Sequence, residues 1–471
     1  MSGKKSREVF KVQLNKMVST IRQQILKGDI KIGEYLPSEL LLAEQFGLSK
    51  NSVRKGLEEL VAEGLIVKKS RIGNMVVSTQ PFDQIILRVG YYPTLIKDAQ
   101  FQELIRKFEV ENPNIKVQTI ALPYDHYQQT VFDFFHNDMI DVVTINFKDF
   151  KDFDQLHDSV FEEMDWDEDS YSFLQHPFKK HEKSNQVYVR PFVFSPIVLC
   201  YNKDHFDASN LPYPDSGWKW TEALEIASRL MADHEDDKAC GLYFHPLSMN
   251  RWPIFMLQNR VEFDRNEQGD ISFPVDELMQ SVNFIRRTFD EQGTMNTFLS
   301  DSDRDAEKIF LEQKASMIMA SYFSLNEIRK HSIQYDIAPL PYMKDPGTLL
   351  LIIGLAINKY SSKKNAALKF VGFIGSETAQ EVIRTNTLSI PAMKRVAERQ
   401  GNENVYKPSR FHLFREIIPT YRMFTDLGLN SKELGEVRNE LRIYLSDLMD
   451  DKIFHQRLKS KLSQTNILEK I

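Results

Sequence analysis

The sequence predicts a multi-domain protein in which a small α+β domain is followed by a much larger α/β domain. Helically spaced apolar residues and two short strands fill the first 80 residues, whereas strands alternate with amphipathic helices beyond residue 85. At 471 residues the chain also exceeds the usual size of one domain. We therefore place the two domains at residues 1–80 and 86–471, joined by a linker at 81–85.

The charge of the chain is divided in the same way. Residues 1–80 hold 14 Lys and Arg against 8 Asp and Glu, a net charge of +6, and the remaining 46 basic and 58 acidic residues give −12. A basic head on an acidic body indicates that the head meets a polyanion such as DNA. Because the sequence contains no apolar run of spanning length and no signal peptide, we expect a cytoplasmic protein without membrane contact.

Three helices and a hairpin are predicted in order within the first domain. Apolar residues at helical spacing mark the first helix around 14–25. A serine begins and a glycine ends each of the next two helices, at 38–47 and 49–64. Short strands at 65–68 and 75–78 flank a turn-rich tip. This order predicts a winged helix-turn-helix domain.

The third helix begins with a polar turn, because its apolar stripe starts only at Val53. A recognition helix reads base edges in the major groove from its first residues, while neighbouring hydroxyl and amide groups hold phosphates. Lys50 and Asn51 are therefore expected to meet bases, and Arg71 at the wing tip to enter the minor groove. The expected DNA-binding residues are Ser38, Ser49, Lys50, Asn51, Ser52, Arg54, Arg71 and Gly73. Since such proteins usually meet two half-sites of double-stranded operator DNA, we expect a homodimer.

The first domain resembles the GntR family of bacterial regulators over nearly all of residues 8–78. The motifs that carry the resemblance are GEYLPSE at 33–39, LAEQFGLS at 42–49, VRKGLEEL at 53–60 and EGL at 63–65. The chain departs from the family at Leu40 and Lys50, where arginine is usual. The resemblance implies a DNA-binding transcription regulator.

The second domain is predicted to be α/β with a largely parallel sheet. Strands are expected at 85–91 and 115–120 with an amphipathic helix at 99–111 between them, and the alternation continues through 141–143. Glycine-rich phosphate loops are absent from the sequence. Cys200 and Cys240 lack metal-ligand spacing, so we expect neither a metal nor a cofactor.

An ordered series of short motifs in this domain resembles family 1 extracellular solute-binding proteins, over roughly residues 85–460. The series runs FE at 108–109, NPNIKV at 112–117, DVV at 141–143, RPF at 190–192, LCYNKD at 199–204, LPYP at 211–214, WKW at 218–220, FLEQKASM at 310–317, APLP at 338–341 and AALKF at 366–370. The resemblance implies a two-lobed periplasmic-binding-protein-like fold of type II. Its crossing strands would lie at 191–196 and around Gly354, with a ligand in the cleft.

The ligand expected in such a cleft is a sugar or oligosaccharide. A sugar ring offers C–H faces and hydroxyl edges, which suit aromatic rings together with amide and carboxylate groups. By their positions in the motifs, the candidate ligand-binding residues are Tyr92, Asn146, Phe192, Phe194, Trp252 and Tyr322. For each of them alone, packing in the core is the simpler interpretation.

Three classes of protein remain open on the sequence. The leading hypothesis is a non-enzymatic regulator whose operator binding is controlled by a small molecule in the cleft. The alternative is a GntR-type head fused to a pyridoxal-phosphate aminotransferase-like body, which needs a Schiff-base lysine in a Ser-rich loop. Neither Lys314 nor Lys359 has that setting. A transport receptor is the third class, and it would require secretion.

Overall fold

The computed structural model describes residues 2–70, 72–78, 84–154, 160–179, 184–232, 239–266, 270–290, 302–330, 332–401 and 403–465. The chain divides into two compact units, each considered by itself. Unit 1 comprises residues 1–89, 102–120 and 362–370, and unit 2 comprises residues 90–101, 121–361 and 371–471. The predicted linker at 81–85 overlaps residues outside the described ranges, so the domain boundaries remain a prediction.

Unit 1 contains the expected succession of three helices and a hairpin. The elements are α1 (Ser2–Lys27), α2 (Glu39–Phe46), α3 (Lys50–Ala62), β1 (Ile66–Lys69) and β2 (Gly73–Val76). The two strands pair antiparallel, with Ile66 opposite Val76. The helix-turn-helix corner is made at Gly47, which takes a left-handed conformation (φ 63°) and donates its N–H to carbonyls of α2. This conformation carries little cost for glycine alone.

A single apolar cluster holds these elements together. The clustered side chains come from α1, α2, α3 and both strands, and the fully buried ones include Met17, Ile25, Val53, Leu60 and Val76. Burying such side chains stabilises a fold by roughly 1.5–3 kcal/mol each, before entropy is counted. The helical spacing read from the sequence therefore corresponds to a real core face.

Unit 1 also contains the first two strands of the α/β domain and one of its helices. These are β3 (Ile85–Tyr91), α5 (Phe101–Glu111), β4 (Ile115–Ala121) and part of α15 (Lys364–Ile374). Strands β3 and β4 are neighbours in a sheet. The Phe108 ring on α5 meets the Phe370 ring on α15 edge-on, with centroids 5.1 Å apart. The strands and helix predicted over 85–120 are thus present within one or two residues.

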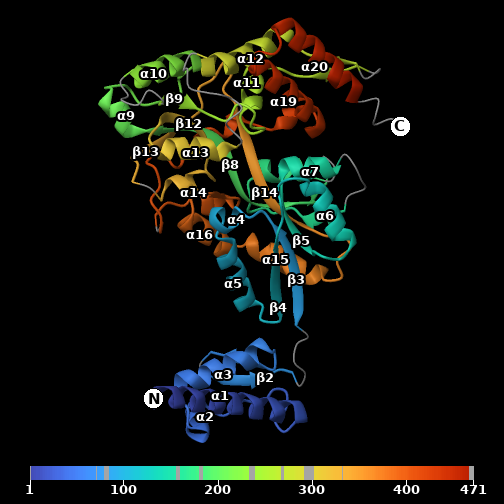
Figure 1. Cartoon of the computed structure of the whole chain (residues 1–471). Helices are drawn as coiled ribbons and strands as arrows, with labels where there is room; N and C mark the ends of the chain where they lie inside the picture. The colour runs from blue at the N-terminus through green and yellow to red at the C-terminus, as the bar shows by residue number, and fades with distance from the viewer. Residues whose placement is uncertain are drawn as a thin grey trace. The chain divides into compact units, whose positions relative to one another are not determined.

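The sheet of unit 2 is built around two long strands, β8 (Arg190–Asn202) and β14 (Thr348–Ile357), which pair with each other (Figure 1). The sheet path in this unit runs β5 (Val142–Asn146), β14, β8, β12 (Ala315–Ser321) and β9 (Cys240–Tyr243). Shorter strands join it: β13 (Tyr335–Ala338) and β15 (Ile390–Pro391) pair with β8, and β16 (Tyr421–Arg422) pairs with β14. The predicted crossing segments therefore lie side by side, with Gly354 opposite Pro191.

The expectation of a largely parallel sheet was wrong for this unit. Strand β14 pairs antiparallel with β5 and with β8, and β8 pairs antiparallel with β12, β13 and β15. Of the strands on the sheet path, β12 and β9 pair parallel. The physical reason is that β8 and β14 lie in the middle of the sheet and do not follow the alternation of strand, helix and strand. Parallel neighbours are expected only where two strands are joined by such a helical crossover.

Helices cover the strands of unit 2. Near β5 lie α6 (Tyr127–His136) and α7 (Phe147–Asp154), while α10 (Trp220–Ala232) packs on β9 and α13 (Asp303–Leu311) on β12. Helix α11 (Trp252–Gln258) packs on α12 (Val275–Asp290), and α19 (Ser431–Leu445) on α20 (Asp451–Thr465). The short helices α4 (Leu95–Asp98) and α14 (Leu325–Ile328) and the helix α16 (Glu377–Asn386) complete the elements used below.

Two further properties concern the described part of the chain only. None of its helices combines the length and the apolar character that a membrane crossing needs. Its His, Cys, Asp and Glu side chains form no group of three or more that would hold a metal ion.

A close approach of α10 to β9 allows a test of the packing. A Cβ atom added at Gly241 would lie 2.1 Å from the carbonyl oxygen of Ala227, which is backbone and cannot rotate away. We expect Gly241→Ala to lower the free energy of unfolding by about 1–3 kcal/mol, measured by denaturant titration. As a matched control, Gly435→Ala in α19 meets nothing within 4 Å and should be neutral or stabilising. Equal stability of the two variants would contradict the described packing.

Candidate functional site

The start of α3 presents a polar turn on the surface of unit 1. Ser49 caps the helix, because its Oγ accepts the N–H of Ser52 at 3.2 Å, and the two hydroxyls lie 2.6 Å apart. Lys50 and Asn51 are exposed, whereas Ser52 and Val53 are buried. The apolar stripe thus turns the side chains of Lys50 and Asn51 outward.

The other predicted DNA-binding residues around α2 and α3 make internal bonds. Ser38 caps α2 by accepting the N–H of Leu41 at 3.3 Å. Arg54 is exposed, and its Nε donates to Glu39 Oε2 at 2.7 Å. Each of these groups would have to exchange an existing bond for a bond to a phosphate.

The wing differs partly from the expectation. Gly73 begins β2 with a φ of 136°, opposite Lys69 of β1, and Arg71 lies outside the described residues. Sequence reasoning overlooked Lys68 and Lys69, which are both exposed on β1 directly before the turn. Their adjacency to the predicted hairpin tip was the available signal.

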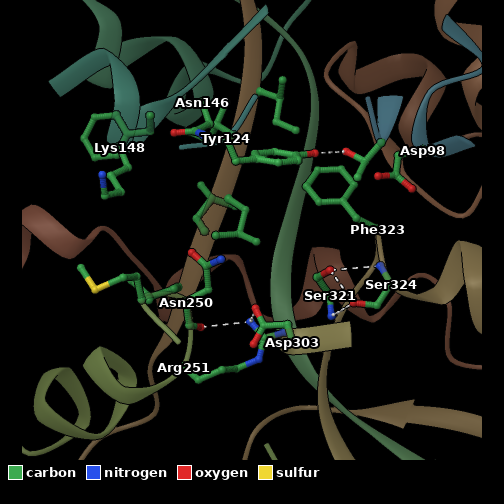
Figure 2. A pocket seen from close by; sticks show the side chains of 18 of the residues that line it. Asp98, Tyr124, Asn146, Lys148, Asn250, Arg251, Asp303, Ser321, Phe323 and Ser324 are labelled. Carbon is green, nitrogen blue, oxygen red and sulfur yellow. Dashed lines mark hydrogen bonds and ion pairs between the residues drawn. The ribbon is translucent and has the colours of Figure 1, made fainter. Parts of the chain in front are cut away.

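Unit 2 contains a cavity of about 670 Å³ lined by the first half of β14 (Figure 2). Its floor is formed by residues 349–353 of that strand. One wall comes from α4, from the loop after β4, from the end of β5 and from the start of α7. This wall includes Thr94, Lys97, Asp98, Tyr124, Asn146, Phe147 and Lys148. The opposite wall comes from the starts of α11 and α13 and the end of β12. That wall includes Met249, Asn250, Arg251, Ser302, Asp303, Arg304, Glu307, Ser321, Phe323 and Ser324.

Two aromatic side chains, Tyr124 and Phe323, line the cavity (Figure 2). Tyr124 is 53% exposed, and its hydroxyl donates to Thr94 Oγ1 at 2.9 Å. Its ring stacks on the buried ring of Tyr92, with centroids 5.5 Å apart and planes 4° from parallel. The Tyr124 ring is therefore held in place from behind and presents its open face to the cavity.

A buried polar network behind the first wall fixes Asn146. The Asn146 amide donates to Tyr92 Oη at 3.0 Å and to Asp149 Oδ2 at 2.8 Å, and its Oδ1 accepts the N–H of Asp149 at 2.8 Å. The Tyr92 hydroxyl donates to Asp149. Burial, and then the charge of Asp149, raises the pKa of Tyr92 well above its usual value, so the phenol stays protonated.

The opposite wall is organised by Arg251, which is almost fully buried. Its Nε donates to the Met319 carbonyl at 3.0 Å, and its Nη1 lies 3.6 Å from Asp303 Oδ2. The same carboxylate oxygen accepts the Ser248 hydroxyl at 3.0 Å. Asp303 Oδ1 is buried and has no hydrogen-bond partner. The start of α13 is thus tied to β12 while one carboxylate oxygen stays unsatisfied.

An ion pair joins α4, on the first wall, to α14. Lys97 Nζ donates to Glu327 Oε2 at 2.8 Å, and both side chains are about one-third exposed. This bond, opposed by partial burial and aided by Lys330, lowers the pKa of Glu327.

The six predicted ligand-binding residues fall into two groups. Asn146 lines the cavity, and Tyr92 lies directly behind it. Four others are 0% exposed and are not among the residues that line the cavity: Phe192, Phe194, Trp252 and Tyr322. Strand β8 is buried on both faces, and the Tyr322 hydroxyl donates to the Phe411 carbonyl at 2.8 Å. These four side chains pack the interior beneath or beside the cleft.

Sequence reasoning missed the residues that project from loops and helix starts. Tyr124 lies three residues after the end of β4, a strand that the sequence predicted, and Phe323 directly follows the predicted ligand residue Tyr322. Asp98 gave no signal, because an acidic residue at the end of a short helix is common on protein surfaces.

Comparison with known families identifies both parts of the chain. Residues 92–381 match the model of the bacterial extracellular solute-binding protein family, which is more than half of the chain. The chain belongs to this family. Residues 15–76 match the model of the gntR family of bacterial regulatory proteins. The N-terminal part of this solute-binding family member is thus a gntR-type helix-turn-helix region, and both predicted resemblances are confirmed.

Individual relatives agree with this division. An uncharacterized HTH-type transcriptional regulator of Escherichia coli is 39% identical over 61 residues, which are 13% of this chain and 26% of the relative. T. maritima MalE3 with bound maltose superposes with a TM-score of 0.69 at 14% identity, over 81% of this chain and 100% of that one. An ABC substrate-binding protein of Listeria monocytogenes in complex with cycloalternan gives 0.67 at 17% identity, over 81% and 99%.

These matches confirm the predicted fold class, a helix-turn-helix domain followed by a type II periplasmic-binding-protein-like domain. They also overturn the aminotransferase-like alternative, because the body of this solute-binding family member has a different fold. Both families are non-enzymatic.

The ion pair between α4 and α14 can be tested by charge reversal. We expect Lys97→Glu and Glu327→Lys each to lower the free energy of unfolding and the double reversal to recover part of the loss. For a partly exposed pair the coupling should be about 0.2–1 kcal/mol in a double-mutant cycle. Because the pKa of Glu327 is lowered in the folded state, the coupling is present above its unfolded pKa and is lost as the pH falls through the lowered value.

The control for this cycle is Lys330, which contacts Glu327 from three residues away on the same segment. A Lys330→Glu and Glu327→Lys cycle probes only that local contact. A Lys97 cycle with no coupling at neutral pH and low salt would show that the pair does not join the two elements in solution.

Proposed function

We propose that this protein is a transcription regulator that binds double-stranded operator DNA as a homodimer in the cytoplasm. In this proposal, a carbohydrate held in the cleft of unit 2 controls operator binding. The observation that carries the proposal is the pairing, in one chain, of a gntR-type helix-turn-helix with a solute-binding domain that contains a 670 Å³ cavity.

The DNA half of the proposal is supported by the chemistry of the first turn of α3. Lys50 and Asn51 are exposed there, and lysine and asparagine side chains bond the major-groove edges of guanine and adenine respectively. The expected phosphate contacts are made by Ser38, Ser49, Ser52 and Arg54 around this turn. The exposed Lys68 and Lys69 of the wing strand add positive charge for the backbone.

The carbohydrate half is supported by the chemistry of the cavity walls. Tyr124 and Phe323 offer ring faces for sugar C–H groups, and the Asn250 amide offers donors and an acceptor for hydroxyls. Both N–H groups of the Asn146 amide are bonded to Tyr92 and Asp149, so Asn146 offers a ligand only the remaining lone pair of its Oδ1. Similar folds are known with bound maltose and with bound cycloalternan. We assign the ligand contacts to these cavity-lining side chains, with Tyr92 and Asp149 as their support.

Control of DNA binding follows from ligand-dependent closure. A ligand that contacts both walls favours the closed arrangement of the cleft and so shifts the populations of the two states. In a dimer such a shift changes the relative placement of two DNA-binding heads, and two half-sites lie about one helical turn apart. Affinity for the operator then depends on the ligand.

The DNA contact is tested by alanine substitutions in the first turn of α3. We expect Asn51→Ala to cost about 1–3 kcal/mol of operator binding and to relax base preference at one position. Lys50→Ala should also weaken binding. The measurement is selection of binding sites from a random duplex pool, followed by titration of the selected operator at fixed salt. The exposed Gln23 on α1 supplies the control, because Gln23→Ala should leave binding unchanged. If Asn51→Ala keeps the site preference of the wild type, Asn51 does not contact a base.

The sugar site is tested by thermal-shift screening of mono- and oligosaccharides. A ligand at about 100 times its dissociation constant adds roughly 2.7 kcal/mol of stability. Tyr124→Ala should abolish the shift, whereas the exposed Tyr360→Ala, whose side chain does not line the cavity, should keep it. If an active saccharide leaves operator affinity unchanged at saturation, the regulatory proposal fails even though binding stands.

A further inference from the structure

The carboxylate of Asp98 is placed in the cleft without a complete set of partners. It is the last residue of α4, it lines the cavity, and it is 6% exposed (Figure 2). Its Oδ1 atom is buried and accepts no hydrogen bond. The Thr94 hydroxyl donates to the carboxylate, which leaves the other acceptor directed to no protein donor. A buried acceptor of this kind is uncommon in a native structure and needs an explanation, of which a partner from outside the chain is one.

The charged groups that face Asp98 do not neutralise it. Lys97, on the same helix, attracts the Asp98 carboxylate through its charge but gives its hydrogen bond to Glu327 at 2.8 Å. From α13, Arg304 attracts the carboxylate and Glu307 repels it. Burial is the largest influence and raises the pKa of Asp98 to about 7. Burial likewise raises the pKa of Glu307, whose carboxylate receives a hydrogen bond from Ser324.

A third carboxylate lies on the same wall as Glu307. Asp303, one turn before Glu307 on α13, also lines the cavity and also has a buried Oδ1 without a partner. The cavity is therefore lined by two carboxylates, one from α4 and one from α13, that each have one buried oxygen without a protein donor. Hydroxyl or ammonium groups would satisfy these acceptors, whereas a phosphate or carboxylate would add a negative charge beside them.

We propose that Asp98 accepts hydrogen bonds from the ligand, and that the cleft selects polyhydroxylated ligands that are neutral or carry an amine and excludes phosphorylated or acidic ones. This inference deepens the proposed function and rests on it, since it concerns the ligand of the same cleft. The inference is based on the oxygens of Asp98 and Asp303 that have no protein donor. The carboxylates of α4 and α13 together would repel a negatively charged ligand.

A dependence of affinity on pH follows from this assignment. Donors from the ligand stabilise the ionised carboxylate, so binding requires Asp98 to lose its proton. With a pKa near 7, the ionised fraction rises about tenfold between pH 6 and pH 8, and affinity should rise by up to that factor. The Glu307 carboxylate repels that of Asp98, whereas Lys97 and Arg304 attract it.

The first experiment needs no ligand. The folded pKa of Asp98 lies above its unfolded value, so the ionised group destabilises the fold increasingly as the pH rises from about 4 to 7. Asp98→Asn removes this penalty while keeping the shape of the side chain. We expect the variant to have a higher Tm than the wild type at pH 8, with the difference vanishing near pH 4. The exposed Asp264→Asn, outside the cavity, is the control and should show no such pattern.

The second experiment compares probes of different charge on the full chain. Maltose, glucosamine and glucose 6-phosphate are titrated into the wild type and Asp98→Asn at pH 6 and pH 8, with thermal shift as the readout. The expected result is binding of a neutral or amino sugar, tighter at pH 8, that weakens at least tenfold in Asp98→Asn, and no binding of the phosphate ester.

The outcomes separate this inference from the proposed function. If the phosphate ester binds more tightly than a neutral sugar, or if Asp98→Asn binds as well as the wild type, the inference fails while carbohydrate sensing stands. If no saccharide binds, carbohydrate sensing fails, and the stability comparison still decides the state of Asp98. An Asp98→Asn variant that is no more stable than the wild type at pH 8 overturns the inference.

Discussion

The pairing of β8 with β14 is the constraint on which the cleft of unit 2 depends. Both strands are long and almost wholly buried, and their pairing runs from Leu350 opposite Pro196 to Leu355 opposite Arg190. The register shifts at Gly354, where a Cβ atom would lie 2.4 Å from Val189 and 2.7 Å from the Arg190 carbonyl. Only glycine permits this approach, and the floor of the cavity at 349–353 lies directly before it.

The cavity walls are held by polar bonds that burial strengthens. Asn146 is fixed by Tyr92 and Asp149, and the start of α13 is fixed by Arg251 and Ser248. In a low-dielectric interior a satisfied network, such as the one around Asn146, holds a geometry firmly, and an unsatisfied group is costly. Asp98 and Asp303, which line the cavity, each have one buried oxygen without a protein donor, and the proposed ligand contact is based on these atoms.

The sequence was sufficient to predict the parts of the fold that local patterns determine. The caps at Ser38 and Ser49, the corner at Gly47 and the core face through Val53 are each encoded within a few residues, and they are present as predicted. The order of the solute-binding motifs likewise predicted the fold class and the crossing at Gly354. Strand direction was predicted wrongly, because a buried strand has the same apolar pattern whether its neighbours are parallel or antiparallel.

The cleft could not be predicted residue by residue for a related reason. Phe192 and Phe194 lie on a strand that is buried on both faces. The local sequence pattern around such a side chain does not differ from the pattern around an aromatic side chain that faces a ligand. The side chains that line the cavity stand instead in loops and at helix starts, as Tyr124 and Asp98 do, where no periodicity distinguishes inward from outward positions. Their role depends on long-range pairing of the strands beneath them, which a local pattern does not encode.

The internal bonds of unit 1 bear on how an operator would be chosen. The hydroxyls of Ser49 and Ser52 already bond each other, and Arg54 is paired with Glu39. A phosphate contact by these groups replaces a bond instead of adding one, so its net gain in free energy is small. Contacts by the exposed Lys50 and Asn51 carry no such exchange. In the proposed function, discrimination between sequences therefore depends mainly on these two side chains, while attraction to the duplex comes from lysines elsewhere on the head, such as Lys68 and Lys69.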